Sequence, residues 1–339
     1  MKRLRFFEKI IFFFNSVAAF ALLLSYILPF LPPKTFAALS VLSLGVPFLI
    51  LLNVVFFIYW LVKVKKQLLL SLLILIVGYM YFGSIYKFSE SKTIENKDNL
   101  SIMNFNVRLF NLYKWIPEDN IENKLVEFVK KESPDILALQ EYHPRETVDF
   151  SFYKYKYEKL SGKKVKLGQA IFSKYPIVNS GSIAFPNTAN NAIFADVVKG
   201  NDTVRVYNIH LQSLRIDTRV EQLTTQDSEK LFDGVGQTFK MQQFQTELFL
   251  LHKRQCKYKM IVSGDFNNTA LSYVYKEIKG DLVDTFKAAG NGFGRTYNFK
   301  FFPMRIDFIL THPDFKINSF KTYDVEYSDH YPIMTKVSF

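Results

Sequence analysis

The chain has 339 residues, a net charge of +12 and a single cysteine. One thiol excludes an intrachain disulfide and a zinc site built on several cysteines. Eight basic residues and one acid lie before residue 87, so +7 of the +12 belongs to that short N-terminal part. The basic balance therefore gives little support for nucleic-acid binding.

Three uncharged apolar runs follow one another near the N-terminus, at residues 10–31, 36–62 and 68–86. About 20 apolar residues cross a bilayer core, so we predict three transmembrane helices and a membrane anchor over residues 1–86. The first run is too long for the apolar part of a cleaved signal peptide, and two further runs follow it. Because no ionisable side chain interrupts the runs, transport is not expected. The anchor either only tethers the protein or also gives access to lipid or a partner.

The basic residues beside these runs predict the orientation of the anchor. Cytoplasmic flanks of membrane helices carry an excess of Lys and Arg. Only Lys34 lies between the first two runs. Seven others precede the first run or separate the second from the third: Lys2, Arg3, Arg5, Lys9, Lys63, Lys65 and Lys66. The N-terminus is therefore expected in the cytoplasm. Everything after residue 86 then lies outside it, on the periplasmic side in a bacterium.

Residues 87–99 are polar and are predicted to be a linker, and one domain is predicted over residues 100–339. Strand-like runs alternate there with helical patterns, which predicts two packed sheets with helices outside. Residues 215–233 fit either a substrate-contacting loop or a solvated helix. We expect strands at 102–107, 136–140, 170–173, 192–198, 204–210, 260–263, 306–310 and 333–337, and helices at 121–131 and 236–253.

Acidic, amide and imidazole side chains lie in these strands or at their ends. Side chains gathered from the ends of several strands build one active site in an α/β fold. Their mixture of groups suits a hard divalent cation and a phosphate ester. The candidates are Asn106, Glu141, His210, Asp265, Asn267, Asp307, Asp329 and His330.

Some of these residues also have structural explanations. A carboxylate such as Glu141, after a buried strand, often caps a turn, and Gly264-Asp-Phe-Asn fits an Asx-turn. Asp307 stands inside an otherwise apolar strand, where an unpaired acid is costly. His330 is the partner that we expect for it.

Six strings carry a resemblance to a known family. Together they resemble the ordered motifs of the endonuclease/exonuclease/phosphatase superfamily, over about residues 100–339. The resemblance implies a four-layered α/β sandwich, in which two packed mixed sheets are flanked by helices. It also implies attack of water on phosphorus that depends on Mg²⁺, with Mn²⁺ as a second suitable ion. The strings are Asn104-Phe-Asn-Val, Leu139-Gln-Glu, Asn208-Ile-His-Leu, Gly264-Asp-Phe-Asn, Arg305-Ile-Asp-Phe-Ile and Ser328-Asp-His-Tyr-Pro.

The same resemblance implies the metal ligands. Glu141 would be the principal ligand, aided by Asn106. Asp329 would support either a second metal position or the neighbouring His330.

The resemblance also implies catalytic roles. His330, oriented by Asp307, would act as general base or as a phosphate-binding imidazolium. Asp265 would orient or deprotonate the attacking water, and Asn267 would hold a non-bridging oxygen. His210 would donate a hydrogen bond to the phosphoryl group as charge develops.

The resulting expectation is a membrane-anchored, metal-dependent phosphodiesterase. Nuclease-like cleavage comes first, because Gly264-Asp-Phe-Asn and Ser328-Asp-His resemble the nuclease and deadenylase branches. The alternative is a phospholipid or sphingolipid phosphodiesterase or a lipid phosphatase, because the anchor would hold the cleft beside a bilayer. An inactive binding module is a third reading, and the complete set of site residues argues against it.

Overall fold

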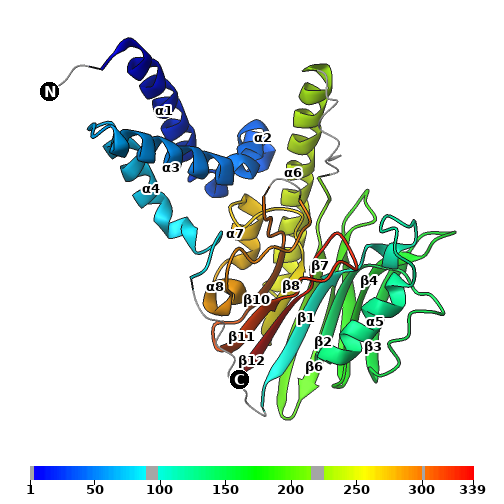
Figure 1. The fold of residues 1–339 in the computed structure, drawn as a ribbon. Coiled ribbons are helices and arrows are strands. Elements are labelled where there is room, and N and C mark those ends of the chain that lie inside the picture. The colour runs from blue at the N-terminus through cyan, green and yellow to red at the C-terminus, as the bar shows by residue number, and fades with distance from the viewer. Residues whose placement is uncertain (1–3, 89–97, 215–224, 300–301) are drawn as a thin grey trace.

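A computed structural model describes residues 4–88, 98–214, 225–299 and 302–339. Most of the predicted linker, residues 89–97, and residues 215–224 of the unassigned stretch lie outside the described residues. Helices of the N-terminal part lie to one side of a domain built from two sheets (Figure 1). The long helix α6, Thr225–Lys253, stands beside this helical part.

The first apolar run forms α1, Phe6–Ser25, and the third forms α4, Leu68–Phe82. Two helical segments of the described chain, Phe6–Phe30 and Pro33–Val62, are long and apolar enough to cross a membrane. The apolar part of α4 is shorter, at Leu68–Tyr79. The length criterion is thus met by two of the three expected helices.

The second apolar run is not one uninterrupted helix. It is covered by α2, Pro33–Val41, which begins before the run, a 3₁₀ turn η2, Leu42–Gly45, and α3, Val46–Val62. Phe36 has non-helical dihedral angles inside α2, and Pro47 occupies the first turn of α3. Proline is favoured in a first turn because its missing N–H needs no partner there. The prolines and Gly45 therefore divide the run into two helices.

Polar side chains join the three long N-terminal helices. Trp60 of α3 donates its indole N–H to the amide oxygen of Asn15 of α1 at 2.9 Å. The amide nitrogen of Asn15 donates to the hydroxyl of Ser71 of α4 at 2.7 Å. All three side chains are buried. Such hydrogen bonds between apolar helices fix which faces meet.

The remaining chain forms two six-stranded mixed sheets. The first has the order β11-β12-β1-β2-β4-β3 and the second β5-β6-β7-β8-β10-β9. Each contains one parallel pair, β1 with β2 and β7 with β8, and the other described pairs are antiparallel. The strands are β1 Leu100–Asn106, β2 Ile136–Tyr142, β3 Tyr155–Ser161, β4 Leu167–Ser173, β5 Ile177–Ala184, β6 Asn191–Lys199, β7 Asp202–His210, β8 Lys259–Asp265, β9 Val283–Asp284, β10 Asp307–Thr311, β11 Lys316–Thr322 and β12 Ile333–Ser338.

Aliphatic side chains from both sheets, such as Ile102, Ile136 and Val206, form the core between them. On the outer face of the first sheet packs α5, Ile121–Glu132, through Leu125 and Val129. The second sheet is covered by α6 and α7, Tyr273–Lys279, and a short helix α8 spans Thr285–Ala289. The predicted fold class, two mixed sheets with helices outside, is confirmed.

The helical part is docked on the two-sheet domain. The backbone N–H of Lys34, at the start of α2, donates to the Gln243 side chain of α6 at 2.8 Å. Arg305, which precedes β10, donates to the carbonyl oxygen of Ser84 at 3.2 Å. Lys87 and Gly292 exchange two backbone hydrogen bonds of 2.8 and 3.0 Å. Contacts at the start of α2 and after α4 thus set the position of the helical part beside the sheets.

Candidate active site

The carboxyl ends of the two parallel pairs face each other across the sandwich. Asn106 ends β1, Glu141 lies next to the end of β2, and His210 and Asp265 end β7 and β8 in register. Parallel neighbours finish at the same edge of a sheet, so polar side chains from both sheets meet there. The pleat and the strand order therefore gather four residues that lie far apart in the sequence.

Backbone irregularities aim two of these side chains. Glu141 has φ +48°, where the register of β2 against β4 shifts between Leu139 and Tyr142. A bulge of this kind turns a side chain toward a site. Gly264 has φ +150°, and a Cβ there would lie 2.0 Å from the carbonyl oxygen of Ile209. Only glycine lets β8 approach β7 so closely, immediately before Asp265.

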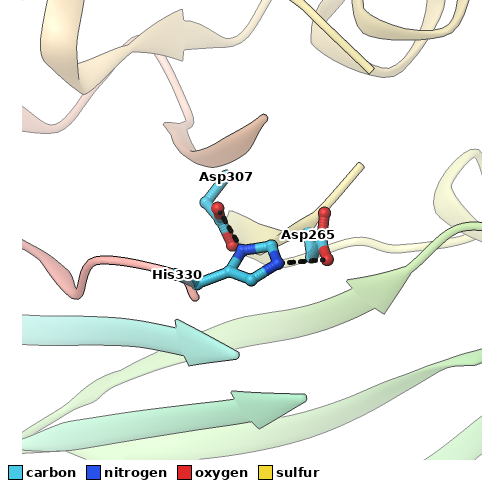
Figure 2. Close-up of side chains that lie close together, drawn as sticks. All are labelled: Asp265, Asp307 and His330. Carbon is cyan, nitrogen blue, oxygen red and sulfur yellow. Dashed lines mark hydrogen bonds and ion pairs between the residues drawn. The ribbon is translucent and has the colours of Figure 1, made fainter. Parts of the chain in front are cut away.

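His330 lies between two carboxylates (Figure 2). Its Nδ1 is 2.9 Å from Asp307 and its Nε2 is 3.7 Å from Asp265. All three residues are buried. Asp307 thus has the partner that the sequence predicted, and the pairing fixes the orientation of the ring.

The two carboxylates change the acid–base properties of His330. Burial opposes a charged ring, but Asp307 and Asp265 outweigh it and raise the pKa of His330 to about 10. Burial also raises the pKa of Asp265 to about 6, although the charge of His330 acts in the opposite direction. At neutral pH this gives an imidazolium held between two carboxylates.

Asn106 connects Glu141 to this group. Its amide nitrogen donates to Glu141 at 3.3 Å and to Asp265 at 3.0 Å, while its oxygen accepts from the backbone N–H of Arg108 at 3.1 Å. If Asn106 were to bind a cation through its amide oxygen, its side-chain amide would have to flip. Glu141 is half-buried in the pocket wall, and this partial removal from water raises its pKa.

His210 lies behind the same carboxylates. Its Nε2 is buried without a hydrogen-bond partner among the described residues, 3.7 Å from Asp265 and 3.9 Å from Glu141. Burial lowers the pKa of His210, so the ring is neutral at neutral pH. A buried polar atom without a partner points to a missing ligand or water.

The last two predicted residues lie at the edges of the site. The backbone N–H of Asn267 donates to Asp265 at 2.8 Å, and its amide donates to Asp265 at 3.2 Å. Asp329 forms a 3.1 Å ion pair with Arg108, whose guanidinium lies 4.3 Å from the ring centre of Trp115. The bond from the Asn267 backbone to Asp265 is that of an Asx-turn, so Asp265 both forms this turn and belongs to the site.

A cavity of about 140 Å³ opens onto these groups. Five predicted residues line it, and Asn106, His210 and Asp307 contact them from behind. Leu214, Tyr297, Phe299, Met304 and Ile306 form an apolar side of the cavity. None of its described lining residues is Lys or Arg. The five are Glu141, Asp265, Asn267, Asp329 and His330.

Three amide side chains that were not among the predicted site residues lie beneath the site. Gln140 donates to Asn104 at 2.8 Å and also to Asn208 of the opposite sheet, and Asn208 donates to the carbonyl oxygen of Leu139 at 2.8 Å. These three side chains are fully buried. Although the amide oxygen of Gln140 has no hydrogen-bond partner among the described residues, these bonds link the two sheets and specify how they meet. The signal for these amides was present in the same six strings, as amide residues alternating with apolar ones.

These groups fit a divalent cation. Among the described residues, Asp265, Asp307 and His330 form a cluster whose ligand atoms lie within 4.8 Å of one another. Asp307 and His330 are already paired with each other, whereas Glu141 and Asp265 share one amide donor and face the unpartnered Nε2 of His210. Oxygen-rich sites with carboxylates select hard ions such as Mg²⁺.

Comparisons with known families agree with this geometry. The model of the endonuclease/exonuclease/phosphatase family matches residues 103–330. A family model described as a domain of unknown function, DUF8431, matches residues 8–85. The comparison with curated proteins found no match.

Solved structures share the fold. TDP2 of D. rerio, complexed with single-strand DNA product, is 17% identical, with a TM-score of 0.54 over 72% of this chain and 100% of its own. A mannosyl-6-phosphatase of Bacteroides thetaiotaomicron is 17% identical, with a TM-score of 0.50 over 71% of this chain and 100% of its own. A protein of this family from the same bacterium has a TM-score of 0.52 and 17% identity, over 72% of this chain and 98% of its own.

Proposed function

This chain belongs to the endonuclease/exonuclease/phosphatase family and is a phosphoester hydrolase. On that premise, we propose that it is a membrane-anchored, Mg²⁺-dependent phosphodiesterase whose pocket is formed by residues 100–339. The observation that carries this proposal is the gathering of Glu141, Asp265 and His330 around one cavity.

Glu141 is the proposed principal cation ligand, and Asn106 and Asp329 are the candidates to complete the set. A bound Mg²⁺ would polarise a phosphoryl oxygen and neutralise charge that develops in the transition state. The raised pKa of Glu141 supports this choice, since a carboxylate removed from water gains from a nearby cation.

His330 is proposed to act as an imidazolium that donates to the phosphoryl group, because two carboxylates favour its charged form. Of the two roles open from the sequence, this one agrees with the raised pKa of His330. Asp265 is proposed to orient the attacking water and accept its proton. Neutral His210 is proposed to donate a hydrogen bond from Nε2 to the phosphoryl group. Asn267 then holds a non-bridging oxygen. Hydrolysis joins the oxygen of water to phosphorus and breaks one phosphorus–oxygen ester bond, and the departing oxygen takes up a proton.

The proposed location is a bilayer surface outside the cytoplasm. We propose that α1, α3 and α4 are three spans of one bundle and that residues 87–99 lead to the catalytic domain. Lys65, in the turn between α3 and α4, lies 3.7 Å from Glu8 at the start of α1. The opposite connection, through α2, packs on α6 of the catalytic domain. This arrangement supports a basic cytoplasmic end and a catalytic domain on the other side.

Two substrate classes are candidates for this pocket, nucleic acids and phosphate esters that carry an apolar group. A relative in complex with single-strand DNA product supports a nucleic acid. Against it, the described lining of the pocket has no Lys or Arg and has an apolar side. Phosphate contacts by Lys and Arg supply most of the affinity for a polynucleotide. The lining therefore favours an ester that carries an apolar group.

The test uses the full chain in detergent micelles with bis(p-nitrophenyl) phosphate, with Mg²⁺ or with EDTA. Turnover is expected only with Mg²⁺ and should fall by about 10² or more in Asp265→Ala and in His330→Ala. Asp281→Ala, at an exposed position after α7, is the matched control and should keep full activity. Turnover that survives chelation would refute the metal mechanism.

A further inference from the structure

An apolar groove of about 380 Å³ lies between the membrane helix α3 and the catalytic domain. We call it the α3 groove. Pockets that hold small molecules have volumes of roughly 300–1,000 Å³, so this groove is large enough for one. Its walls include Pro47, Ile50 and Val54 of α3, Ile85 after α4, and Phe302 and Pro303 before β10.

The α3 groove continues toward the catalytic pocket. A small cavity of about 30 Å³ shares Phe302 with the groove and Met304 with the catalytic pocket. The ring of Phe302 lies 4.9 Å from that of Phe48 on α3. The backbone N–H of Tyr297 donates to Met304 at 3.2 Å, and the Tyr297 ring lies 5.0 Å from that of His330. The segment before β10 therefore connects the membrane helix to the catalytic imidazole.

The exposed apolar residues beside the groove and its uncharged lining indicate which kind of molecule it would bind. On the same helix, Val55, Ile58 and Leu61 are more than half exposed, and such apolar side chains on a membrane helix face lipid. None of the described lining residues of the groove carries a charge. A hydrocarbon chain from the adjacent bilayer matches this lining, whereas a polynucleotide or a sugar phosphate would leave polar groups without partners.

From these contacts we propose that the α3 groove binds one acyl chain of a membrane phospholipid and that this lipid's phosphodiester is hydrolysed in the catalytic pocket. The inference rests on the proposed phosphodiesterase function and names its substrate class. The apolar side of the pocket, with Phe299 and Met304, then faces the glycerol end of the lipid. The oxygen of water bonds to phosphorus, one ester bond breaks, and the products are a phosphomonoester and an alcohol.

The test compares Val54→Trp, which fills the groove, with Val55→Trp, a valine on the exposed side of the same helix. The full chain is reconstituted in nanodiscs of phosphatidylethanolamine and phosphatidylglycerol. A phosphatidylcholine with a photoreactive acyl chain is included, and cross-links are mapped by mass spectrometry. Turnover of the bilayer lipids, of bis(p-nitrophenyl) phosphate and of a single-stranded oligonucleotide is measured in parallel.

We expect cross-links on α3 and near Phe302 that fall at least fivefold in Val54→Trp and persist in Val55→Trp. The ratio of lipid turnover to bis(p-nitrophenyl) phosphate turnover should fall at least tenfold in Val54→Trp only. Ile50→Trp, a second filling variant, should repeat both effects and guards against a folding defect at one position.

Three results would overturn the inference. Cross-links spread equally over α1, α3 and α4, and unchanged by either filling variant, would remove the groove as a binding site. Oligonucleotide turnover without lipid turnover would move the substrate to nucleic acid. Lipid turnover that the filling variants leave unchanged would separate the groove from catalysis. If neither the unsubstituted chain nor any variant hydrolyses bis(p-nitrophenyl) phosphate, the proposed function fails. The cross-links then still show whether the groove binds an acyl chain.

Discussion

The imidazole Nδ1 of His330 lies 2.9 Å from a carboxylate oxygen of Asp307, and both side chains are buried. Asp307 begins β10 of the second sheet, whereas His330 precedes β12 of the first. The pair therefore joins the two sheets at the site. It also sets the charge on the ring, because the carboxylate favours the protonated form.

Asp307→Asn is expected to lower the pKa of His330 from about 10, because burial is then opposed mainly by Asp265. If the protonated ring is the active form, activity is present below this pKa and is lost as the pH rises through it. The alkaline limb of the pH–rate profile should therefore move to lower pH, with turnover reduced on the order of 10²-fold at neutral pH.

The chain offers a matched control in the ion pair of half-buried His312 with exposed Asp314, whose atoms lie 3.5 Å apart. Asp314→Asn should leave the profile unchanged. An Asp307→Asn profile that moves to higher pH, or not at all, would contradict the imidazolium role.

Glu141→Gln is expected to act mainly on metal affinity. The substitution keeps the size of the side chain but removes a charge that a hard cation requires. The Mg²⁺ concentration for half-maximal activity should rise by about tenfold or more. Loss of a residue that only hydrogen-bonds to a metal ligand already lowers metal affinity by about tenfold, and loss of the ligand itself should do at least as much. The measurement is a Mg²⁺ titration of bis(p-nitrophenyl) phosphate turnover. Glu146→Gln, at an exposed position five residues later, serves as the control. An unchanged Mg²⁺ requirement would exclude Glu141 as a ligand.

A reporter that is active only outside the cytoplasm, fused after Phe339, should be active. The physical reason is the excess of Lys and Arg at one end of the apolar runs. The same reporter inserted into the turn at residues 63–67, between α3 and α4, should be inactive. The opposite pattern would reverse the proposed orientation and place the substrate in the cytoplasm.

Asn15→Ala is expected to loosen the helical bundle. The substitution removes the hydrogen bonds to Trp60 and Ser71 and leaves the indole N–H of Trp60 buried without that partner. Such bonds are worth about 1 kcal/mol in a membrane, so the free energy of unfolding should fall by about that amount. Unfolding by added SDS in mixed micelles measures it. Ser16→Ala is the control, because the Ser16 hydroxyl bonds only to a carbonyl of its own helix. Equal losses in both variants would show that the network contributes nothing specific.

The sequence alone was informative where a local pattern meets a strong physical requirement. A buried acid in an apolar strand needs a partner, and His330 was correctly predicted for Asp307. Strands of the core, such as β7 and β8, were expected from their apolar runs. The edge strand β3 was not, because none of its side chains is fully buried and aromatic residues alternate with charged ones. Helix α6 also begins earlier than its expected start at residue 236, in a polar stretch without apolar periodicity.

What the sequence determined by itself was the division between apolar helices and an α/β domain, and the set of polar residues at strand ends. Both follow from composition and short-range periodicity, which act between neighbours in the chain. Only the tertiary structure decided the bulge that aims Glu141, the ion pair of Arg108 with Asp329, and the α3 groove. Each depends on the register between strands, or on contacts between segments far apart in the chain. The residue pattern of one segment gives no information on where a distant segment will pack against it.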